Sequence, residues 1–366
     1  MIELLALFNS MPYKHALRLV VEQVRMLKIM TMETWTATDE AAAHAWAAIA
    51  IALAVAGGVG LFRAGRDLRD TTLLAPWRWT CFSFATLVCG EVSVAWLSAE
   101  GSLACAAHVR YWAGVTTLAP FVALLGAKRP QDRAWQWIVL ALLTLLALPS
   151  AKAMVFDSGT PPAPHSAWRL LLAVLLASQF ANHALTRFWH AALLAGLAQL
   201  TWLAGYLPGV EVPRVGHLSL GGLALATAAI WLARRPRSCR WIRKNSGCRR
   251  LGHEPIDRVW LDFRDAYGAL WALRVAERFN ASAVSHGWPA RLRWQGMRLA
   301  EGVKRQESGV RSQKRAGNGE DGRSVPVAET NVTPAMRQNL KSLLCRFVSP
   351  EWIAERLDTR PASPDQ

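Results

Sequence analysis

Seven long apolar stretches constrain the fold of this chain more than any other feature of its sequence. They cover residues 44–62, 77–98, 103–126, 134–156, 168–186, 189–207 and 216–233. A helix needs about 20 mostly apolar residues to cross the roughly 30 Å of hydrocarbon in a bilayer. The sequence therefore predicts an all-α polytopic membrane protein, with a bundle of about seven transmembrane helices in residues 33–236. The fifth and sixth stretches are joined by a very tight turn at Arg187, so six crossings are the alternative.

Lys and Arg residues in the short loops predict how the bundle lies in the membrane, because they are concentrated on the cytoplasmic side. With seven crossings the basic loops all fall on one side, and they contain Arg63, Arg66, Arg69, Arg78, Lys128, Arg129, Arg133 and Arg187. We therefore expect a multi-pass protein of the bacterial inner (plasma) membrane, with its N-terminus outside and its C-terminus in the cytoplasm.

Residues 1–32 do not fit this orientation, since Lys14, Arg18, Arg25 and Lys28 would lie on the outer side. One interpretation is an amphipathic helix that lies at the membrane surface. The other, which we favour, is an N-terminal extension upstream of a later starting methionine. Either interpretation leaves the predicted bundle unchanged.

A polybasic juxtamembrane segment, residues 237–253, follows the bundle. A run of basic residues begins at the end of the last apolar stretch and continues through this segment. It consists of Arg234, Arg235, Arg237, Arg240, Arg243, Lys244, Arg249 and Arg250. Residues 234–366 hold 26 of the 42 Lys and Arg residues but only 14 of the 26 Asp and Glu residues. Because the run adjoins the last apolar stretch, its position favours binding to anionic lipid at the cytoplasmic face. We do not expect nucleic acid as a partner.

The remaining residues predict a small, mostly helical cytoplasmic domain. In residues 254–300, apolar side chains recur at steps of three and four residues, which predicts an amphipathic helix followed by a short extended segment. Asp262 and Asp265 are interpreted as part of the solvated face of this helix. Residues 301–334 contain few large apolar groups and predict a disordered linker. Residues 335–366 predict closing helices and a tail.

This cytoplasmic domain has only about 70 residues that can form a core, which is marginal for independent folding. We therefore expect it to pack on itself, on the membrane surface or on a partner protein. Within its closing part, Ser349 is predicted to cap a helix whose first residue is Pro350, because proline suits the first helical position.

Two ionisable residues lie deep inside the predicted membrane segments, Glu91 in the second and Arg110 in the third. A charge at such depth costs several kcal/mol unless it is paired, so such residues mark a functional site or a structural clamp. Each lies seven positions from the short turn between the two segments. At 1.5 Å per residue both would lie about 10 Å below the outer surface. The sequence therefore predicts an ion pair between Glu91 and Arg110.

Histidines near the outer ends of the segments are candidate ligands for a small molecule or haem, namely His44, His108 and His217. Haem proteins of membranes use paired histidines, but no predicted helix carries two at the spacing of bis-histidine cytochromes. Haem is thus a minor alternative, and the cofactor is left open. The six cysteines form no close pair, so neither a disulfide framework nor a metal site is expected.

Two classes of function follow from these features. The first is a non-enzymatic membrane protein, such as a sensor, scaffold or assembly factor whose cytoplasmic tail meets a partner. The second is a membrane protein that handles haem, quinone or a small solute and uses the outer histidines and Glu91. We favour the first, because nucleotide-binding, zinc-peptidase and serine-hydrolase patterns are all missing from the sequence.

Overall fold

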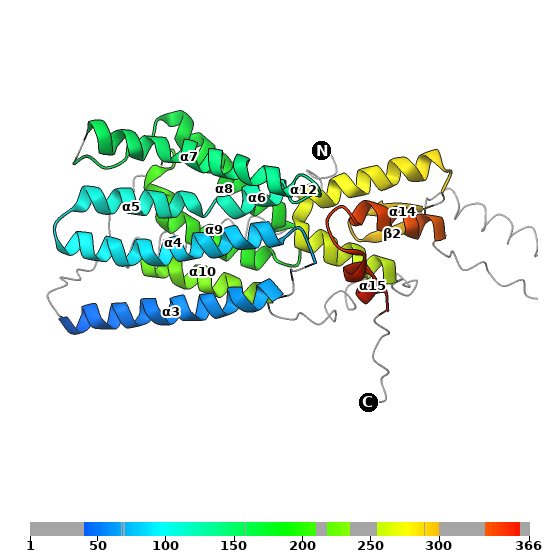
Figure 1. Ribbon diagram of the computed structural model, residues 1–366, viewed down its shortest axis with the longest axis horizontal. Coiled ribbons are helices and arrows are strands. Elements are labelled where there is room, and N and C mark those ends of the chain that lie inside the picture. Colours follow the sequence, from blue (N-terminus) through cyan, green and yellow to red (C-terminus); the bar gives the residue numbers. More distant parts are fainter. Residues whose placement is uncertain are drawn as a thin grey trace, which may run out of the picture.

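Two parts make up the structure, a bundle of apolar helices and a smaller C-terminal domain packed on one end of it (Figure 1). The computed structural model describes residues 40–66, 68, 70–157, 159–209, 218–234, 255–288, 290–299 and 334–358. Most of the described residues are helical. The predicted N-terminal extension, most of the polybasic run and most of the predicted disordered linker lie outside the described residues.

Helices occupy all seven predicted apolar stretches. They are α3 (Glu40–Arg66), α4 (Leu74–Ala99), α5 (Leu103–Thr116), α6 (Ala119–Leu125), α7 (Asp132–Phe156), α8 (Ser166–Ala184), α9 (Trp189–Leu203) with the 3-10 turn η1 (Ala204–Tyr206), and α10 (Leu218–Arg234). Among the described helices, three are long and apolar enough to cross a membrane, over Ala48–Arg66, Leu74–Ser98 and Ala134–Phe156. The apolar part of α10, Leu220–Arg234, is shorter.

The third predicted stretch forms two helices, α5 and α6, because Pro120 interrupts it. Proline has no backbone N–H, so it cannot bond the carbonyl four residues earlier. That carbonyl, of Thr116, accepts a hydrogen bond of 2.6 Å from the hydroxyl of Ser83 in α4 instead. A side chain from the neighbouring helix thus satisfies the group that the break leaves free.

The same physics operates in α7, which contains Pro149. The carbonyl of Leu145, four residues earlier, accepts a hydrogen bond of 3.3 Å from Trp168 Nε1 of α8. Tyr111 of α5 donates to the next carbonyl, of Leu146, at 2.6 Å. Indole and phenol donors from two neighbouring helices therefore hold the proline-containing part of α7 in place.

The C-terminal domain consists of α12 (Pro255–Ser285), β1 (Ala290–Arg293), β2 (Gly296–Leu299), α14 (Pro334–Leu344) and α15 (Pro350–Asp358). β1 and β2 form an antiparallel hairpin, so the predicted extended segment is two short strands. The predicted cap of α15 is present, because the hydroxyl of Ser349 accepts a hydrogen bond of 3.2 Å from the backbone N–H of Trp352.

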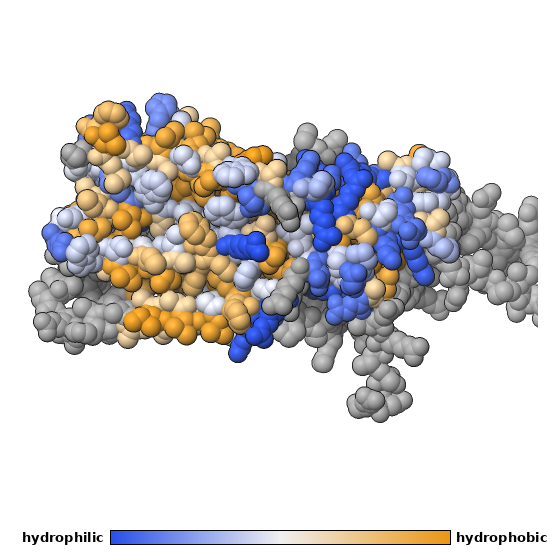
Figure 2. All heavy atoms as spheres, viewed as in Figure 1, coloured by the Kyte–Doolittle hydropathy of each residue, from blue (hydrophilic) through white to orange (hydrophobic). Residues whose placement is uncertain are grey.

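One hydrophobic core joins the C-terminal domain to the bundle. Its aromatic centre is formed by Trp260, Phe263 and Tyr267 of α12, each of them fully buried. The same core contains Leu73 and Ala127, which lie in or beside bundle loops. Figure 2 shows the apolar surface of the bundle giving way to a hydrophilic band where the two parts meet. The domain packs on itself, as one of the three predictions has it, and also on the bundle of the same chain, which was not predicted.

Candidate functional site

The side chain of Glu91 is half-buried in the bundle and is hydrogen-bonded to a tryptophan. Its Oε1 atom accepts a hydrogen bond of 2.6 Å from Trp202 Nε1 of α9. Trp202 is one of the largest fully buried side chains in the described structure. An indole N–H that donates to a carboxylate is a charge-assisted hydrogen bond, roughly twice as strong as a neutral one. Trp202 therefore fixes the position of Glu91.

The ion pair predicted between Glu91 and Arg110 is not present in the described structure. The guanidinium Nε of Arg110 is buried and has no hydrogen-bond partner. Gly114, one helical turn further along α5, packs against Trp202 and Leu203 of α9. Equal depth on α4 and α5 does not decide the pairing, because a third helix, α9, provides the partner of Glu91.

A second buried polar residue of α9, Gln199, lies one helical turn before Trp202. Its Nε2 atom donates hydrogen bonds to the carbonyl of Thr117 at 2.9 Å and to Gln179 Oε1 of α8 at 3.1 Å. Gln199 therefore links the break between α5 and α6 to α8. One turn beyond Gln179, on the same face of α8, lies Asn182.

Asn182 connects the bundle to the C-terminal domain. Helix α12 is broken at Gly268, whose φ of 78° and ψ of −175° are not helical. The amide of Asn182 bridges this break, because its Oδ1 accepts from the backbone N–H of Leu270 at 3.0 Å and its Nδ2 donates to the carbonyl of Tyr267 at 3.4 Å. Asn182 is only 2% exposed. A residue of the bundle thus satisfies backbone groups that the broken helix leaves unpaired.

Charged side chains surround this contact. Arg187, in the turn after α8, lies 3.2 Å from Asp262 and 3.6 Å from Asp265. Asp265 also pairs with Arg264 at 2.7 Å, and Arg356 of α15 pairs with Asp262 at 3.3 Å. The interpretation of both aspartates as a solvated face is wrong for Asp265, which is 4% exposed. Helical spacing alone could not reveal that the turn after α8 covers this face.

Two further bundle loops contact the segment between α14 and α15. The backbone N–H groups of Thr72 and Arg129 donate to the carbonyls of Phe347 and Arg346 at 2.9 and 2.8 Å. The phenol of Tyr267 donates to the carbonyl of Phe347 at 2.8 Å. Burial raises the pKa of this phenol above its usual value. The phenol therefore stays protonated and can keep donating.

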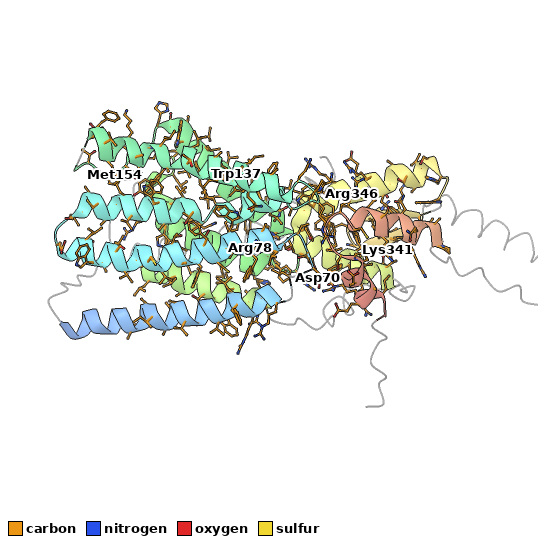
Figure 3. All side chains as sticks on the ribbon, viewed as in Figure 1. Asp70, Arg78, Trp137, Met154, Lys341 and Arg346 are labelled. Carbon is orange, nitrogen blue, oxygen red and sulfur yellow. The ribbon has the colours of Figure 1, made fainter. Side chains whose placement is uncertain are left out.

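A buried tryptophan and a further backbone hydrogen bond also hold the C-terminal domain against the bundle. Trp271 of α12 is buried, and its Nε1 atom donates to the carbonyl of Leu124, at the end of α6, at 2.8 Å. Figure 3 shows Asp70 of the first loop beside the C-terminal domain, and its carbonyl accepts from the backbone N–H of Ser349 at 2.9 Å. The loops after α3, α6 and α8 therefore all meet the same domain.

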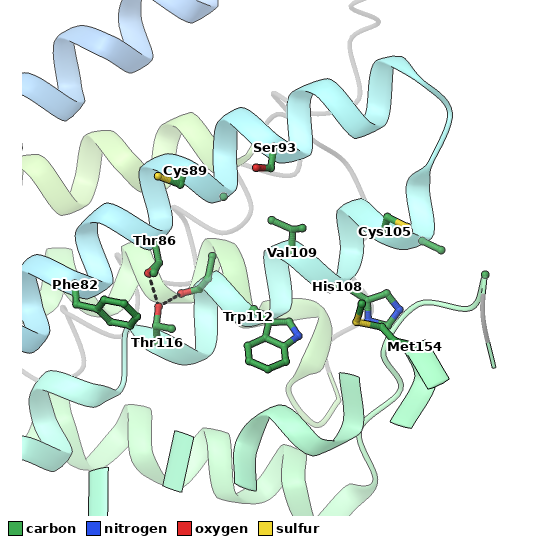
Figure 4. A pocket seen from close by; sticks show the side chains of 14 residues that line it. Phe82, Thr86, Cys89, Ser93, Cys105, His108, Val109, Trp112, Thr116 and Met154 are labelled. Atoms are coloured by element: carbon green, nitrogen blue, oxygen red, sulfur yellow. Dashed lines mark hydrogen bonds between the residues drawn. The ribbon is translucent and has the colours of Figure 1, made fainter. Parts of the chain in front are cut away.

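A groove of about 630 Å³ lies near the other end of the bundle, between α4, α5 and the end of α7 (Figure 4). His108, Val109, Trp112 and Met154 are among the residues that line it. Hydroxyl groups of Thr86 and Thr116 bond to each other at 2.7 Å in its wall. Its lining is mostly apolar, and it is a candidate site for a small apolar molecule.

His108 is held in this wall by two hydrogen bonds. Its Nε2 atom lies 3.1 Å from the carbonyl of Thr160, so this nitrogen carries the proton and donates. Its Nδ1 atom then accepts from the hydroxyl of Ser150 at 2.7 Å, and Trp112 Nε1 donates to the same hydroxyl at 2.8 Å. Both ring nitrogens are thus engaged, which argues against the predicted role of His108 as a haem ligand.

The other predicted site residues are mostly beyond the described residues. The side chain of His44 and all of His217 lie there, as does every member of the basic run from Arg235 to Arg250. The guanidinium of Arg234 lies 5.5 Å from the ring centre of Trp231, at the end of α10. In the part of the chain that the structure describes, no group of three or more His, Cys, Asp or Glu residues could hold a metal ion.

No protein family, curated protein or solved structure matches this chain. Sequence reasoning missed Asn182, Trp202 and Gly268. Two signals could have found Asn182 and Gly268: a lone asparagine near the end of an apolar stretch, and a glycine inside an otherwise regular amphipathic pattern. No signal of this kind marks Trp202.

Proposed function

We propose that this protein is a non-enzymatic bacterial membrane sensor, which passes a change inside its helical bundle to a cytoplasmic C-terminal domain that meets a protein partner. The observation that carries the proposal is the pair of hydrogen bonds from Asn182 of α8 across the break in α12. The backbone groups at the break in α12 have their hydrogen-bond partner on a side chain of the bundle, so they lose that partner when the side chain moves. The broken helix is therefore the element that reports the state of the bundle.

A series of contacts supports this coupling. It begins at Glu91 and Trp202, continues along α9 to Gln199, crosses to Gln179 of α8, and ends at Asn182. Each step is a hydrogen bond or one helical turn on a shared face. The cost of an unpaired buried polar group, about 1–3 kcal/mol, makes each of these contacts sensitive to displacement of its neighbours.

The proposed topology has seven membrane-crossing segments, with α5 and α6 together as the third, and an N-terminus outside. It is supported by the position of the loops after α3, α6 and α8, which are the basic loops and all contact the C-terminal domain. Reporter fusions after residues 70, 130 and 240 are expected to give cytoplasmic signals. A periplasmic signal after residue 240 would contradict this orientation.

The sensor proposal is tested by hydrogen exchange on the full-length protein in lipid nanodiscs. Glu91→Ala is expected to accelerate exchange in a peptide that includes Leu270, because the backbone N–H of Leu270 depends on Asn182 for its acceptor. Asn182→Ala removes that acceptor directly and serves as the positive control.

The matched control for Glu91→Ala is Val92→Ala. Val92 is the next residue of α4 and is 62% exposed on the outside of the bundle, so its truncation leaves the polar contacts intact. If Glu91→Ala and Val92→Ala give the same exchange around Leu270 in folded protein, the bundle and the domain are not coupled through this route.

A second function, binding of a quinone or another small apolar molecule, is favoured by the groove of Figure 4 alone. Its polar side chains His108 and Trp112 are bonded within the fold, so the groove offers a ligand mainly apolar contacts. Solvent extraction and mass spectrometry of the purified protein test this function. Ser93→Trp, which places a large side chain in the lining, is expected to abolish co-purification of the ligand.

A further inference from the structure

Four basic side chains gather where the C-terminal domain meets the end of the bundle. Lys128 follows α6, Arg274 and Arg278 lie one turn apart on α12, and Arg346 follows α14. The backbone hydrogen bond from Arg129 to the carbonyl of Arg346 holds two of these segments together. Partial desolvation, and then the positive charges of Arg278, Arg346 and Arg274, lower the pKa of the Lys128 ammonium. The three arginines therefore lie close enough to Lys128 to act on its charge.

These charges are not neutralised by the domain's own carboxylates. The ion pairs of the C-terminal domain involve Asp262, Asp265 and Glu355, which are paired with other arginines. Within the described part of the chain, none of the four basic residues makes an ion pair. Glu277, which lies on α12 between Arg274 and Arg278, makes none with a described residue either. Figure 3 shows Arg346 on the side of the C-terminal domain that faces the bundle.

Apolar side chains lie beside this basic cluster. Leu270 and Leu273 are 44% and 41% exposed, and they lie on the same face of α12 as Arg274. Leu270 is at the bundle surface, because its backbone N–H bonds Asn182. The apolar span of α7 begins at Ala134, only a few residues after Lys128. Arg274 lies 5.3 Å from the ring centre of Trp271 but has no carboxylate partner among the described residues. Exposed leucines beside such arginines, at the end of a membrane-spanning bundle, are typical of a surface that contacts lipid headgroups.

We propose that Lys128, Arg274, Arg278 and Arg346 form a binding site for the phosphate-bearing headgroup of an anionic lipid, with Leu270 and Leu273 against the lipid's apolar part. The site differs in its residues from the polybasic run after α10. It goes beyond the proposed sensor function and depends only on the placement of the bundle in a membrane. A bound phosphate would offset the repulsion between Lys128 and the three arginines, which a neutral headgroup would do less well.

The test uses the purified full-length protein in detergent, titrated separately with short-chain phosphatidylglycerol, short-chain phosphatidylcholine and inorganic phosphate. The thermal unfolding midpoint reports binding. Phosphatidylglycerol is expected to raise the midpoint, and the other two compounds are not. Arg274→Gln combined with Arg278→Gln is expected to weaken the apparent affinity for phosphatidylglycerol about 30-fold.

Two variants serve as controls. Arg291→Gln with Arg293→Gln removes the same charge from exposed positions of β1 and is expected to keep the wild-type affinity. Arg274→Lys with Arg278→Lys keeps the charge and is expected to restore most of the binding. The unfolding midpoints without lipid show whether each variant is folded.

Equal responses to phosphatidylglycerol and phosphatidylcholine would overturn the proposal. An equal response to inorganic phosphate would assign the site to a free anion and not to a lipid. Equal losses in the α12 and β1 variants would mean that net charge alone attracts the lipid. No response to any of the three compounds would overturn it as well, and would direct attention to an acidic protein surface.

Discussion

Gly268→Ala tests the contact between Asn182 and the break in α12, on which the proposed coupling between bundle and domain depends. The backbone of Gly268, with φ of 78° and ψ of −175°, lies in a region that is essentially restricted to glycine. A Cβ atom there would collide with the side chain of Asn182 and would lie 2.7 Å from its backbone oxygen. Alanine therefore strains the backbone and displaces the residue that satisfies the helix break.

The magnitude follows from two contributions. Backbone strain in this region costs about 1–3 kcal/mol. Loss of the two hydrogen bonds of Asn182, to Tyr267 and Leu270, costs about 1 kcal/mol each. We therefore expect Gly268→Ala to lower the free energy of local opening at the break by roughly 3–5 kcal/mol, which accelerates hydrogen exchange there more than 100-fold.

The matched control is Gly287→Ala. Gly287 also has a positive φ, of 63°, but an added Cβ would meet nothing within 4 Å. Its substitution is expected to cost only about 1–2 kcal/mol and to leave exchange around Leu270 unchanged. Asn182→Ala removes the hydrogen bonds without a collision, so it tests the same contact if Gly268→Ala does not fold. Near-wild-type exchange around Leu270 in folded Gly268→Ala would refute the reasoning.

Three further predictions concern the polar groups of the bundle and the domain. Trp202→Phe removes the indole donor to Glu91 and is expected to lower the free energy of unfolding by about 2 kcal/mol, measured by thermal unfolding in detergent. Asp265→Ala leaves the guanidinium of Arg264 buried without its partner, and a loss of about 3 kcal/mol is expected in the same assay. Burial raises the pKa of Tyr267. The unfolded state therefore loses this proton first, and stability is expected to be constant up to about pH 10 and to fall above it, a slope that Tyr267→Phe should reduce.

Each of these predictions has its own check. Trp137 is 73% exposed, so Trp137→Phe is expected to leave the unfolding midpoint unchanged, and equal losses at both tryptophans would contradict the role of Glu91. If Asp265→Ala is as stable as the wild type, the ion pairs of Asp265 with Arg187 and Arg264 do not contribute to the free energy of unfolding. An identical slope above pH 10 in Tyr267→Phe would assign that slope to other groups.

The apolar stretches and the amphipathic pattern predicted most of the secondary structure. Helices lie in all seven apolar stretches, and α12, α14 and α15 lie where helices were expected. These elements follow from local composition and periodicity, which are properties of neighbouring residues. The site was predicted less well. Glu91 was predicted to need a partner inside the bundle, and it has one, but the predicted partner is wrong, because the distance along a hairpin carries no information about a third helix.

The sequence by itself determined that this chain forms apolar helices, with basic residues concentrated in every second loop between them. It also determined that a basic, mostly helical C-terminal region follows. The tertiary structure decided what the buried polar groups do. Asn182, Trp202 and Asp265 each meet a partner at least 75 residues away along the chain. Such pairings depend on how the helices pack, and packing places a particular donor beside a particular acceptor only once the whole bundle and its C-terminal domain have assembled.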